Sequence, residues 1–252
     1  MEKYFNINDA GASIRCKLYA ADHKDIQKLI LFGHGFGGHK DNRAAERFAK
    51  HVLDKNRGVA VMTFNWPCHG DDVRKTLRLE DCDLYLHTIL SWIGRTYPAA
   101  VPYAYATSFG GYLFLKYISD HGDPFQKTAL RCPAVRLYDV LTSAIMTEAD
   151  RDRIRKGKPA LIGFDRKVEI DGAFLKSVED ADLTKRDFLP YADDLLILHG
   201  TKDEIVSFEA VREFAENNVI DFVPVENADH RFQAPEKMDF ATAEICAFFG
   251  MK

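Results

Sequence analysis

The sequence predicts an α/β fold with a mostly parallel central sheet and helices on both faces. Short apolar runs that suit buried strands recur along the chain, at residues 28–32, 59–64, 102–106 and 195–198. Segments with apolar residues at helical spacing follow these runs. Strands that alternate with helices in this way pair in parallel through right-handed crossovers, so the helices cover both faces of the sheet.

The remaining elements can be assigned in order. Residues 13–21 alternate apolar and polar side chains, which predicts a half-exposed early strand. Helices are expected at residues 43–56, 79–97, 112–118, 207–217 and 235–249, and further strands at 128–135 and 220–225. Pro98 ends the second of these helices.

Between residues 133 and 187 the alternation of strands and helices breaks. This stretch is rich in charge, with a helix expected at 147–155, a hairpin pairing 160–164 with 167–170, and a short helix at 172–178. We interpret residues 133–187 as a small cap inserted into a single domain that spans residues 1–252. Phe164 and Phe174 of this cap either line an acyl or aromatic pocket or pack the cap onto the body.

Composition excludes several classes of protein. The 252 residues carry a formal net charge of −4, which argues against nucleic acid as a partner because phosphate binding needs a basic surface. The N-terminus lacks the layout of a secretory signal, and no apolar run of about 18 residues could span a membrane. The five cysteines are scattered and odd in number, which favours free thiols. We therefore expect a cytoplasmic protein; its oligomeric state is left open.

A serine lies at the carboxyl end of the strand expected at residues 102–106. Small residues, Ala106 and Gly110, stand two positions before and two after Ser108, as a sharp strand-to-helix turn requires. The pattern matches the Gly-x-Ser-x-Gly nucleophile elbow, with Ala106 in place of the first glycine. Because a serine before a helix also serves as an N-cap, the assignment depends on partner residues elsewhere.

Candidate partners for this serine lie at the ends of later strands. A serine hydroxyl needs a neighbouring base, and His230 lies in the loop at residues 226–230 after the last strand. Asp203 follows the preceding strand and could orient the imidazole, and Asp139 is an alternative acid. The chain order Ser108, Asp203, His230 suits a serine hydrolase. All three lie where open α/β sheets bind ligands.

Together these motifs resemble the α/β-hydrolase fold family of serine hydrolases. Besides the elbow, the resemblance rests on the His34-Gly35 turn and on the stretches 199–203 and 228–232, and it covers nearly the whole chain except the cap. The stretch 34–40 and the short cap are most similar to carboxylesterases grouped with feruloyl esterases and monoacylglycerol lipases, with serine aminopeptidases close by. The resemblance implies an oxyanion hole formed by the backbone N–H groups of Phe36 and Phe109.

Some residues depart from the family pattern or have structural interpretations. Asn65-Trp66-Pro67-Cys68-His69-Gly70 replaces the usual Gly-His-Gly loop, so the resemblance does not extend to substrate contacts there. For His34, His69 and His199 we expect structural hydrogen bonding. A metal site at His34, His39 and His69 has no supporting His-x-His or His-Glu-x-x-His spacing, and we expect neither a metal nor a cofactor.

The resulting hypothesis is a carboxylesterase-like serine hydrolase that cleaves a small-molecule ester through an acyl-enzyme intermediate. Ser108 would be the nucleophile, His230 the base and Asp203 its orienting acid. An amidase or aminopeptidase would use the same triad, with Glu148, Asp150 or Asp152 available to bind an α-amine. Two non-hydrolytic alternatives are a catalytically silent binding protein and a cofactor-binding doubly wound domain. The latter lacks the Gly-x-Gly-x-x-Gly spacing.

Overall fold

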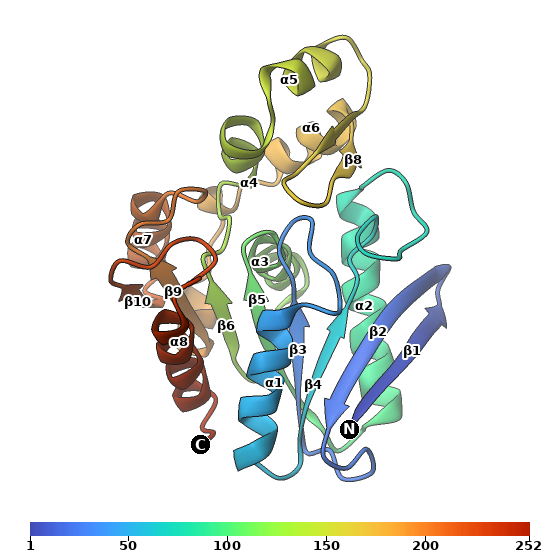
Figure 1. The fold of residues 1–252 in the computed structure, drawn as a ribbon, viewed down its shortest axis with the longest axis vertical. Helices are drawn as coiled ribbons and strands as arrows, with labels where there is room; N and C mark the ends of the chain where they lie inside the picture. The colour runs from blue at the N-terminus through green and yellow to red at the C-terminus, as the bar shows by residue number, and fades with distance from the viewer.

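The computed structural model describes residues 1–252, and an eight-stranded sheet forms its centre (Figure 1). The strands follow the spatial order β1-β2-β4-β3-β5-β6-β9-β10. Their bounds are β1 Glu2–Asp9, β2 Ala12–Ala20, β3 Lys28–Gly33, β4 Val59–Phe64, β5 Val101–Thr107, β6 Thr128–Arg131, β9 Leu195–Gly200 and β10 Asp221–Val225. From β4 to β10 all neighbours pair in parallel, whereas β2 pairs antiparallel with both β1 and β4. The predicted mostly parallel sheet is therefore confirmed.

Helices cover both faces of this sheet, as the sequence predicts. Helices α1 (Arg43–Lys55) and α8 (Pro235–Phe248) enclose one apolar core against the sheet. Helices α2 (Leu79–Thr96), α3 (Phe109–His121) and α7 (Phe208–Asn217) enclose a larger core on the other face. None of the helices combines the length and the apolar character that crossing a bilayer requires.

The first strand, β1, has no counterpart among the predicted elements. It forms a hairpin with β2 through a tight turn at Ala10 and Gly11, both of which have positive φ. Ile7 is its single buried residue, because the strand lies at the edge of the sheet and exposes most of its side chains. The alternation of apolar and polar residues that identifies a half-buried strand is therefore too weak to predict β1 from the sequence.

The strand expected at residues 128–135 is shorter than the sequence predicts. β6 ends at Arg131, because Cys132 takes a positive φ of 48° and Pro133 has no N–H to continue a ladder. The chain then leaves the sheet at the edge where the carboxyl ends of the parallel strands meet.

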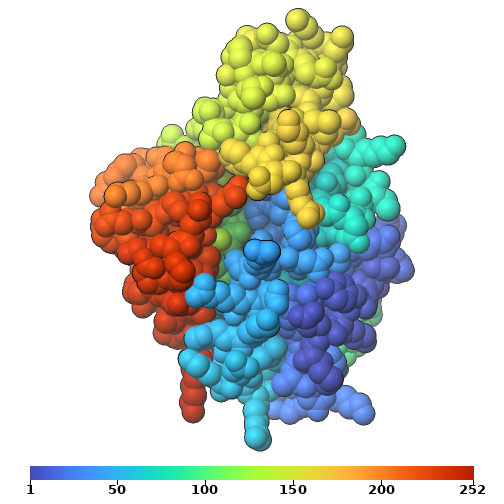
Figure 2. All heavy atoms as spheres, in the orientation of Figure 1, coloured from blue at the N-terminus to red at the C-terminus, as the bar shows by residue number.

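The segment between β6 and β9 forms a separate lobe above the carboxyl ends of the strands (Figures 1 and 2). It contains α4 (Leu137–Asp139), a π-helix (Val140–Ile145), α5 (Glu148–Arg155), the antiparallel pair β7 (Ala160–Ile162) and β8 (Val168–Ile170), α6 (Gly172–Asp180) and two short 3₁₀ turns at Leu183–Lys185 and Leu189–Asp194. The expected helices and hairpin are present, and the π-helix is an additional feature.

Specific contacts attach this lobe to the body. Arg78, which precedes α2, donates two hydrogen bonds to the Asp171 carboxylate, at 2.9 and 2.6 Å. The Tyr112 hydroxyl of α3 donates to the Ala181 carbonyl at 3.0 Å. Phe174 of α6 is fully buried in the larger core. Polar and apolar contacts together therefore hold the lobe in place.

Ser108 lies on the turn between β5 and α3, and its backbone conformation is strained. Its φ of 52° and ψ of −117° fall outside the regions that residues with a Cβ favour. The turn also depends on close backbone approach, since a Cβ on Gly110 would lie 2.5 Å from the Gly33 carbonyl oxygen. Gly33 is the register partner of Ala106, and a Cβ there would lie 3.3 Å from that of Ala106. A glycine on the neighbouring strand thus makes room for the alanine that departs from the elbow pattern.

We expect Gly110→Ala to prevent folding or to destabilise the protein severely, because its Cβ would meet two backbone carbonyl oxygens of the β3 end, at 2.5 and 2.6 Å. Gly94→Ala on α2 is the matched control, since its Cβ meets nothing within 4 Å and alanine should add about 0.5–1 kcal/mol of stability. Urea unfolding of both variants checks this. Similar stabilities for the two variants would contradict the close approach.

Releasing the strain at Ser108 should stabilise the protein. Glycine tolerates positive φ, so we expect Ser108→Gly to exceed Ser108→Ala in free energy of unfolding by about 1 kcal/mol, although glycine is the more flexible residue when unfolded. Chemical denaturation of the two variants side by side measures the difference. A less stable glycine variant would show that the turn stores no strain.

Candidate active site

The three side chains that the sequence proposes as a triad lie in one hydrogen-bonded chain. Ser108 Oγ lies 3.0 Å from His230 Nε2, and His230 Nδ1 lies 2.7 Å from Asp203 Oδ2. They come from loops that follow β5, β9 and β10, whose carboxyl ends meet at one edge of the sheet. If Nδ1–H donates to the carboxylate, Nε2 is free to accept the serine hydroxyl proton.

The Asp203 carboxylate is fully buried and saturated with hydrogen bonds. Its Oδ1 accepts from the backbone N–H groups of Ile205 at 2.9 Å and Val206 at 2.8 Å. Its Oδ2 faces His230 and also His199 Nε2, at 3.1 Å. Burial raises the pKa of Asp203, but the hydrogen bonds from His199 and His230 and the charge of His230 outweigh it and hold this pKa well below its usual range. The carboxylate therefore stays ionised at neutral pH.

His199 supports the carboxylate, a role more specific than the structural hydrogen bonding expected from the sequence. Its Nε2 lies 3.1 Å from both the Val206 carbonyl oxygen and Asp203 Oδ2. A single Nε2–H shared between these two acceptors orients the carboxylate toward His230. The sequence signal is the spacing of four residues between His199 and Asp203 within one strand-end turn.

Two backbone N–H groups beside Ser108 have no hydrogen-bond acceptor within the chain. They belong to Phe36, in the loop after β3, and to Phe109, the first residue of α3. The two phenyl rings meet edge to face with centroids 5.5 Å apart. The loop lies against the turn at Ser108, since a Cβ on Gly35 would lie 3.3 Å from Ser108 Cβ. Both donors are therefore free to bind an oxygen atom of a ligand.

His34 is a structural residue, as expected. Its Nδ1 lies 2.8 Å from the Gly35 carbonyl oxygen, and its Nε2 accepts from the Trp66 backbone N–H at 3.3 Å. Burial lowers its pKa well below the usual range, so the ring is neutral. Since both nitrogens are engaged with backbone groups, His34 has no lone pair to offer to a metal shared with His39 and His69.

His69 contacts Phe36, in the loop after β3, and Phe109 of α3. Its Nδ1 bonds to the Pro67 carbonyl oxygen at 2.8 Å, and its ring stacks on Phe109 with centroids 5.7 Å apart. Burial lowers the pKa of His69 to about 4, so this ring is also neutral at neutral pH. Its Nε2 is buried without a partner. His69 thus braces the Phe109 side of the turn, in line with its expected structural role.

One group of metal-ligating side chains is close enough to share an ion, namely Cys132, Asp203 and His230, whose ligand atoms lie within 4.8 Å of one another. Burial raises the pKa of the Cys132 thiol, which keeps it protonated and a poor ligand. The aspartate and the imidazole already bond to each other. This donor set does not fit a metal.

The other candidate acids lie away from Ser108. Asp139, the alternative orienting acid, is exposed on α4, and the hydrogen bond to His230 Nδ1 comes from Asp203. Glu148 and Asp152 pair with arginines of their own helix α5, and Asp150 caps its N-terminus. None of these three acids lines the cavity above Ser108.

A cavity of about 640 Å³ opens above Ser108 and His230. Figure 2 shows the molecule hollowed at this place, beneath the yellow atoms of the lobe and between the red C-terminal and the blue N-terminal parts. Its walls are residues 35–39 after β3, residues 41–44 at the start of α1, and Ile145, Phe164 and Arg166 of the lobe. Phe164 is half exposed and lines the cavity, whereas Phe174 is buried in the core. The two aromatic residues of the lobe thus have different roles.

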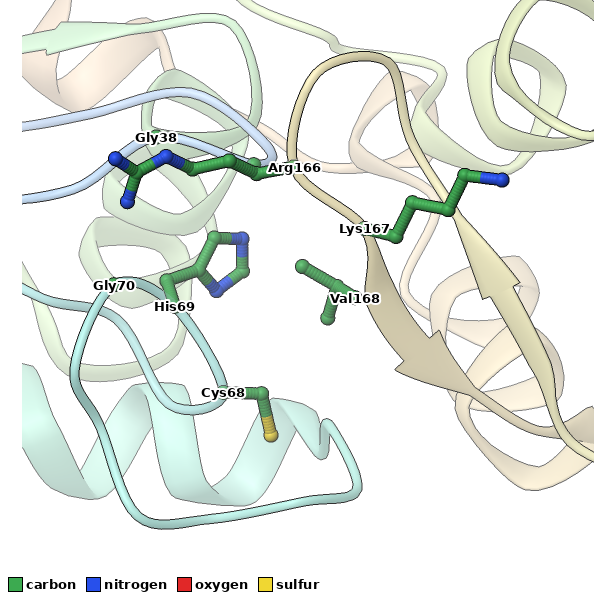
Figure 3. A pocket seen from close by; sticks show the side chains of 8 residues that line it. Gly38, Cys68, His69, Gly70, Arg166, Lys167 and Val168 are labelled. Carbon is green, nitrogen blue, oxygen red and sulfur yellow. The ribbon is translucent and has the colours of Figure 1, made fainter.

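The loop that departs from the family pattern lines a neighbouring cavity of about 310 Å³ (Figure 3). Cys68, His69 and Gly70 form one wall, and the turn between β7 and β8 forms the other. In Figure 3 Arg166 extends over His69 toward Gly38, while Lys167 points away. This loop contributes no residue to the lining of the Ser108 cavity.

Comparison with known proteins identifies solved structures with the same fold. In overall structure the chain is similar to Est1E from Butyrivibrio proteoclasticus with bound ferulic acid, at 17% identity and a TM-score of 0.78 over 97% of both chains. It is also similar to a monoacylglycerol lipase from Paleococcus ferrophilus, at 19% identity and a TM-score of 0.64 over 94% of this chain and 98% of that one. A third similar structure is mouse alpha/beta hydrolase domain-containing protein 10, at 17% identity and a TM-score of 0.69 over 98% of each chain. Curated protein sequences give no significant match.

At these identities the solved structures show the fold alone. The sequence itself matches the model of the alpha/beta hydrolase family over residues 29–243, which span the sheet from β3 onward and the three candidate triad residues. The chain therefore belongs to the alpha/beta hydrolase family.

Proposed function

We propose that this protein is a serine hydrolase that cleaves carboxylic esters through an acyl-enzyme intermediate. The observation that carries the proposal is the hydrogen-bonded chain from Ser108 Oγ through His230 to the buried Asp203 carboxylate, with contacts of 3.0 and 2.7 Å. A binding protein without catalytic activity has no need of all three groups in this order. The fold similarity to Est1E, whose structure holds ferulic acid, and to a monoacylglycerol lipase supports an ester substrate.

The reaction would proceed in two steps. Ser108 Oγ attacks the carbonyl carbon while His230 Nε2 accepts the hydroxyl proton, and the carbonyl oxygen becomes an oxyanion. The free N–H groups of Phe36 and Phe109 bind this oxyanion. His230 then gives the proton to the leaving alcohol, and a water molecule activated by the same imidazole releases the acid and restores Ser108. Asp203 remains ionised throughout and stabilises the imidazolium.

The lobe at residues 133–187 would act as a cap within a single domain of residues 1–252. Ile145, Phe164 and Arg166 of the lobe face the cavity, where they would contact the substrate and limit the access of water. The same triad could cleave an amide, but the acids of α5 that an aminopeptidase would need are not in the cavity. All five cysteines are free, which supports a reducing compartment such as the cytoplasm.

Removing the serine hydroxyl should abolish hydrolysis and covalent labelling. We expect the wild-type protein to hydrolyse short p-nitrophenyl esters and to react with a fluorophosphonate probe, and Ser108→Ala to lose the labelling and at least about 10⁴-fold in kcat/KM. Ser91→Ala on α2, outside the cavity, is the control and should behave as the wild type. Equal labelling of Ser108→Ala and wild type would refute the proposed nucleophile. Labelling without ester turnover would instead indicate an amide substrate.

Exchanging the orienting acid should slow catalysis without removing the nucleophile. Asp203→Asn keeps the shape of the side chain but no longer holds the His230 tautomer and charge, so we expect kcat to fall by about 10⁴-fold. Asp139→Asn tests the alternative acid and should keep kcat close to that of the wild type, because Asp139 is exposed on α4. A larger loss in Asp139→Asn than in Asp203→Asn would reverse this assignment.

A further inference from the structure

The charged residues that line the cavity above Ser108 have a small positive net charge. Four arginines line it, Arg43, Arg131, Arg166 and Arg231, against three carboxylates, Asp41, Asp165 and Glu204. This contrasts with the net charge of −4 for the whole chain. An excess of positive charge in a cleft favours ligands that carry negative charge.

Ion pairing leaves this positive charge largely free. Asp41 lies 3.2 Å from Lys40 and 3.8 Å from Lys17, which are not part of the cavity lining, so these lysines balance its charge. Arg231 makes an ion pair with Asp165 at 3.7 Å, and both side chains are exposed. Arg43 and Arg166 have no carboxylate partner.

Arg131 stands out among these arginines because it is buried. It is the last residue of β6 and only 7% exposed, yet no carboxylate lies within ion-pair distance of its guanidinium. Its Nη1 donates to the His230 carbonyl oxygen at 3.2 Å, and its Nε–H is buried without an acceptor. The only other polar side chain that interacts with the guanidinium is the neutral Tyr105 hydroxyl, which supplies no counter-charge. The Phe232 ring, 5.1 Å away, provides a cation–π contact that replaces only part of the lost hydration. A buried cation without a counter-ion reduces stability, which indicates that a ligand completes its surroundings.

The position of Arg131 connects it directly to the proposed chemistry. Its carbonyl oxygen accepts the Ser108 N–H at 3.0 Å, and its guanidinium bonds to the backbone of His230. The start of the 13-residue helix α1, at Asn42 and Arg43, lines the same cavity and adds the positive end of its dipole.

We propose that the substrate of the Ser108 site carries a carboxylate apart from the scissile bond, and that Arg131 binds this carboxylate. The proposal rests on the proposed hydrolase function and specifies its substrate class. A single buried guanidinium matches a single negative charge. A doubly charged phosphate would meet Glu204 and Asp165 at the rim of the same cavity.

Arg131 could instead serve only to hold the His230 loop through the His230 carbonyl oxygen. The two roles predict different results. Loss of a purely structural contact lowers activity equally on charged and neutral esters, whereas loss of a carboxylate-binding group lowers activity mainly on the charged ester. The ratio of kcat/KM for a matched pair of substrates therefore separates them.

Two matched substrate pairs test the proposal on either side of the scissile bond. The acyl-side pair is the mono-p-nitrophenyl ester of adipic acid and the same compound with its free carboxylate methylated. The alcohol-side pair is the acetate ester of 4-hydroxybenzoate and that of its methyl ester. We expect the wild type to prefer the carboxylate in at least one pair by about 10- to 100-fold in kcat/KM. A wild-type enzyme that prefers the neutral member of both pairs, or shows no preference, overturns the proposal.

Variants then assign the preference to Arg131. In the pair for which the wild type prefers the carboxylate, Arg131→Gln should bring the ratio of kcat/KM between the charged and the neutral ester close to one. Arg131→Lys should retain part of the preference for the charged ester. Arg47→Gln is the matched control, because Arg47 lies on α1 but outside the cavity, and its ratio should equal that of the wild type. If Arg131→Gln loses equal activity on both members of the pair, Arg131 is a structural residue and the proposal fails. Should Arg131→Gln fail to fold, the proposal is tested by the kcat/KM ratio of the wild type and by whether Arg131→Lys lowers that ratio.

Binding to an inactive variant separates this proposal from the hydrolase function. Calorimetry with adipate and with dimethyl adipate on Ser108→Ala requires no catalysis. We expect adipate to bind Ser108→Ala at least about 10-fold more tightly than it binds Ser108→Ala combined with Arg131→Gln, and dimethyl adipate to show no such difference. Failure of ester hydrolysis with this binding intact would overturn the proposed function alone. Equal adipate affinity in both variants would overturn the role of Arg131.

Discussion

The arrangement of the site depends on the close approach of α3 to the end of β3. Gly110 lies so near the backbone carbonyls of Gly33 and His34 that a side chain there would collide with both. This approach forces the chain to turn sharply at Ser108 and places the loop after β3 beside this serine. The strained conformation of Ser108 and the two free N–H groups of Phe36 and Phe109 are consequences of the same contact. Strain of this kind persists only where the surrounding packing holds it in place.

A second network, centred on Asp203, connects the loops after the last two strands to Ser108. The buried carboxylate faces His230 and His199 and accepts from two backbone N–H groups, which both offsets the cost of burying its charge and fixes its orientation. His230 thereby links Asp203 to Ser108 in one chain of hydrogen bonds. Three loops that are separate in the sequence are thus joined in one hydrogen-bonded unit.

The surroundings of this unit differ on its two sides. Toward the core, His34 and His69 are neutral and held by backbone groups and aromatic rings, so they support the loop after β3 without adding charge. Toward the cavity, Arg131, Arg43 and Arg166 provide positive charge and make no ion pair with a carboxylate. A neutral scaffold and a charged, solvent-reaching cavity suit a substrate with a polar group distant from the reacting carbonyl.

Local sequence determined much of this protein. Apolar runs, their spacing and the small residues around Ser108 predict the parallel sheet, the elbow and the order Ser108, Asp203, His230, because each signal depends on neighbours along the chain. Only the tertiary structure decided the rest. The exposure of β1 at the edge of the sheet removes the alternation of apolar and polar residues that would identify it in the sequence. The environments of His199, Arg131, Phe164 and Phe174 likewise depend on which elements pack against them. Burial and pairing are properties of residues distant in sequence, so no local pattern contains them.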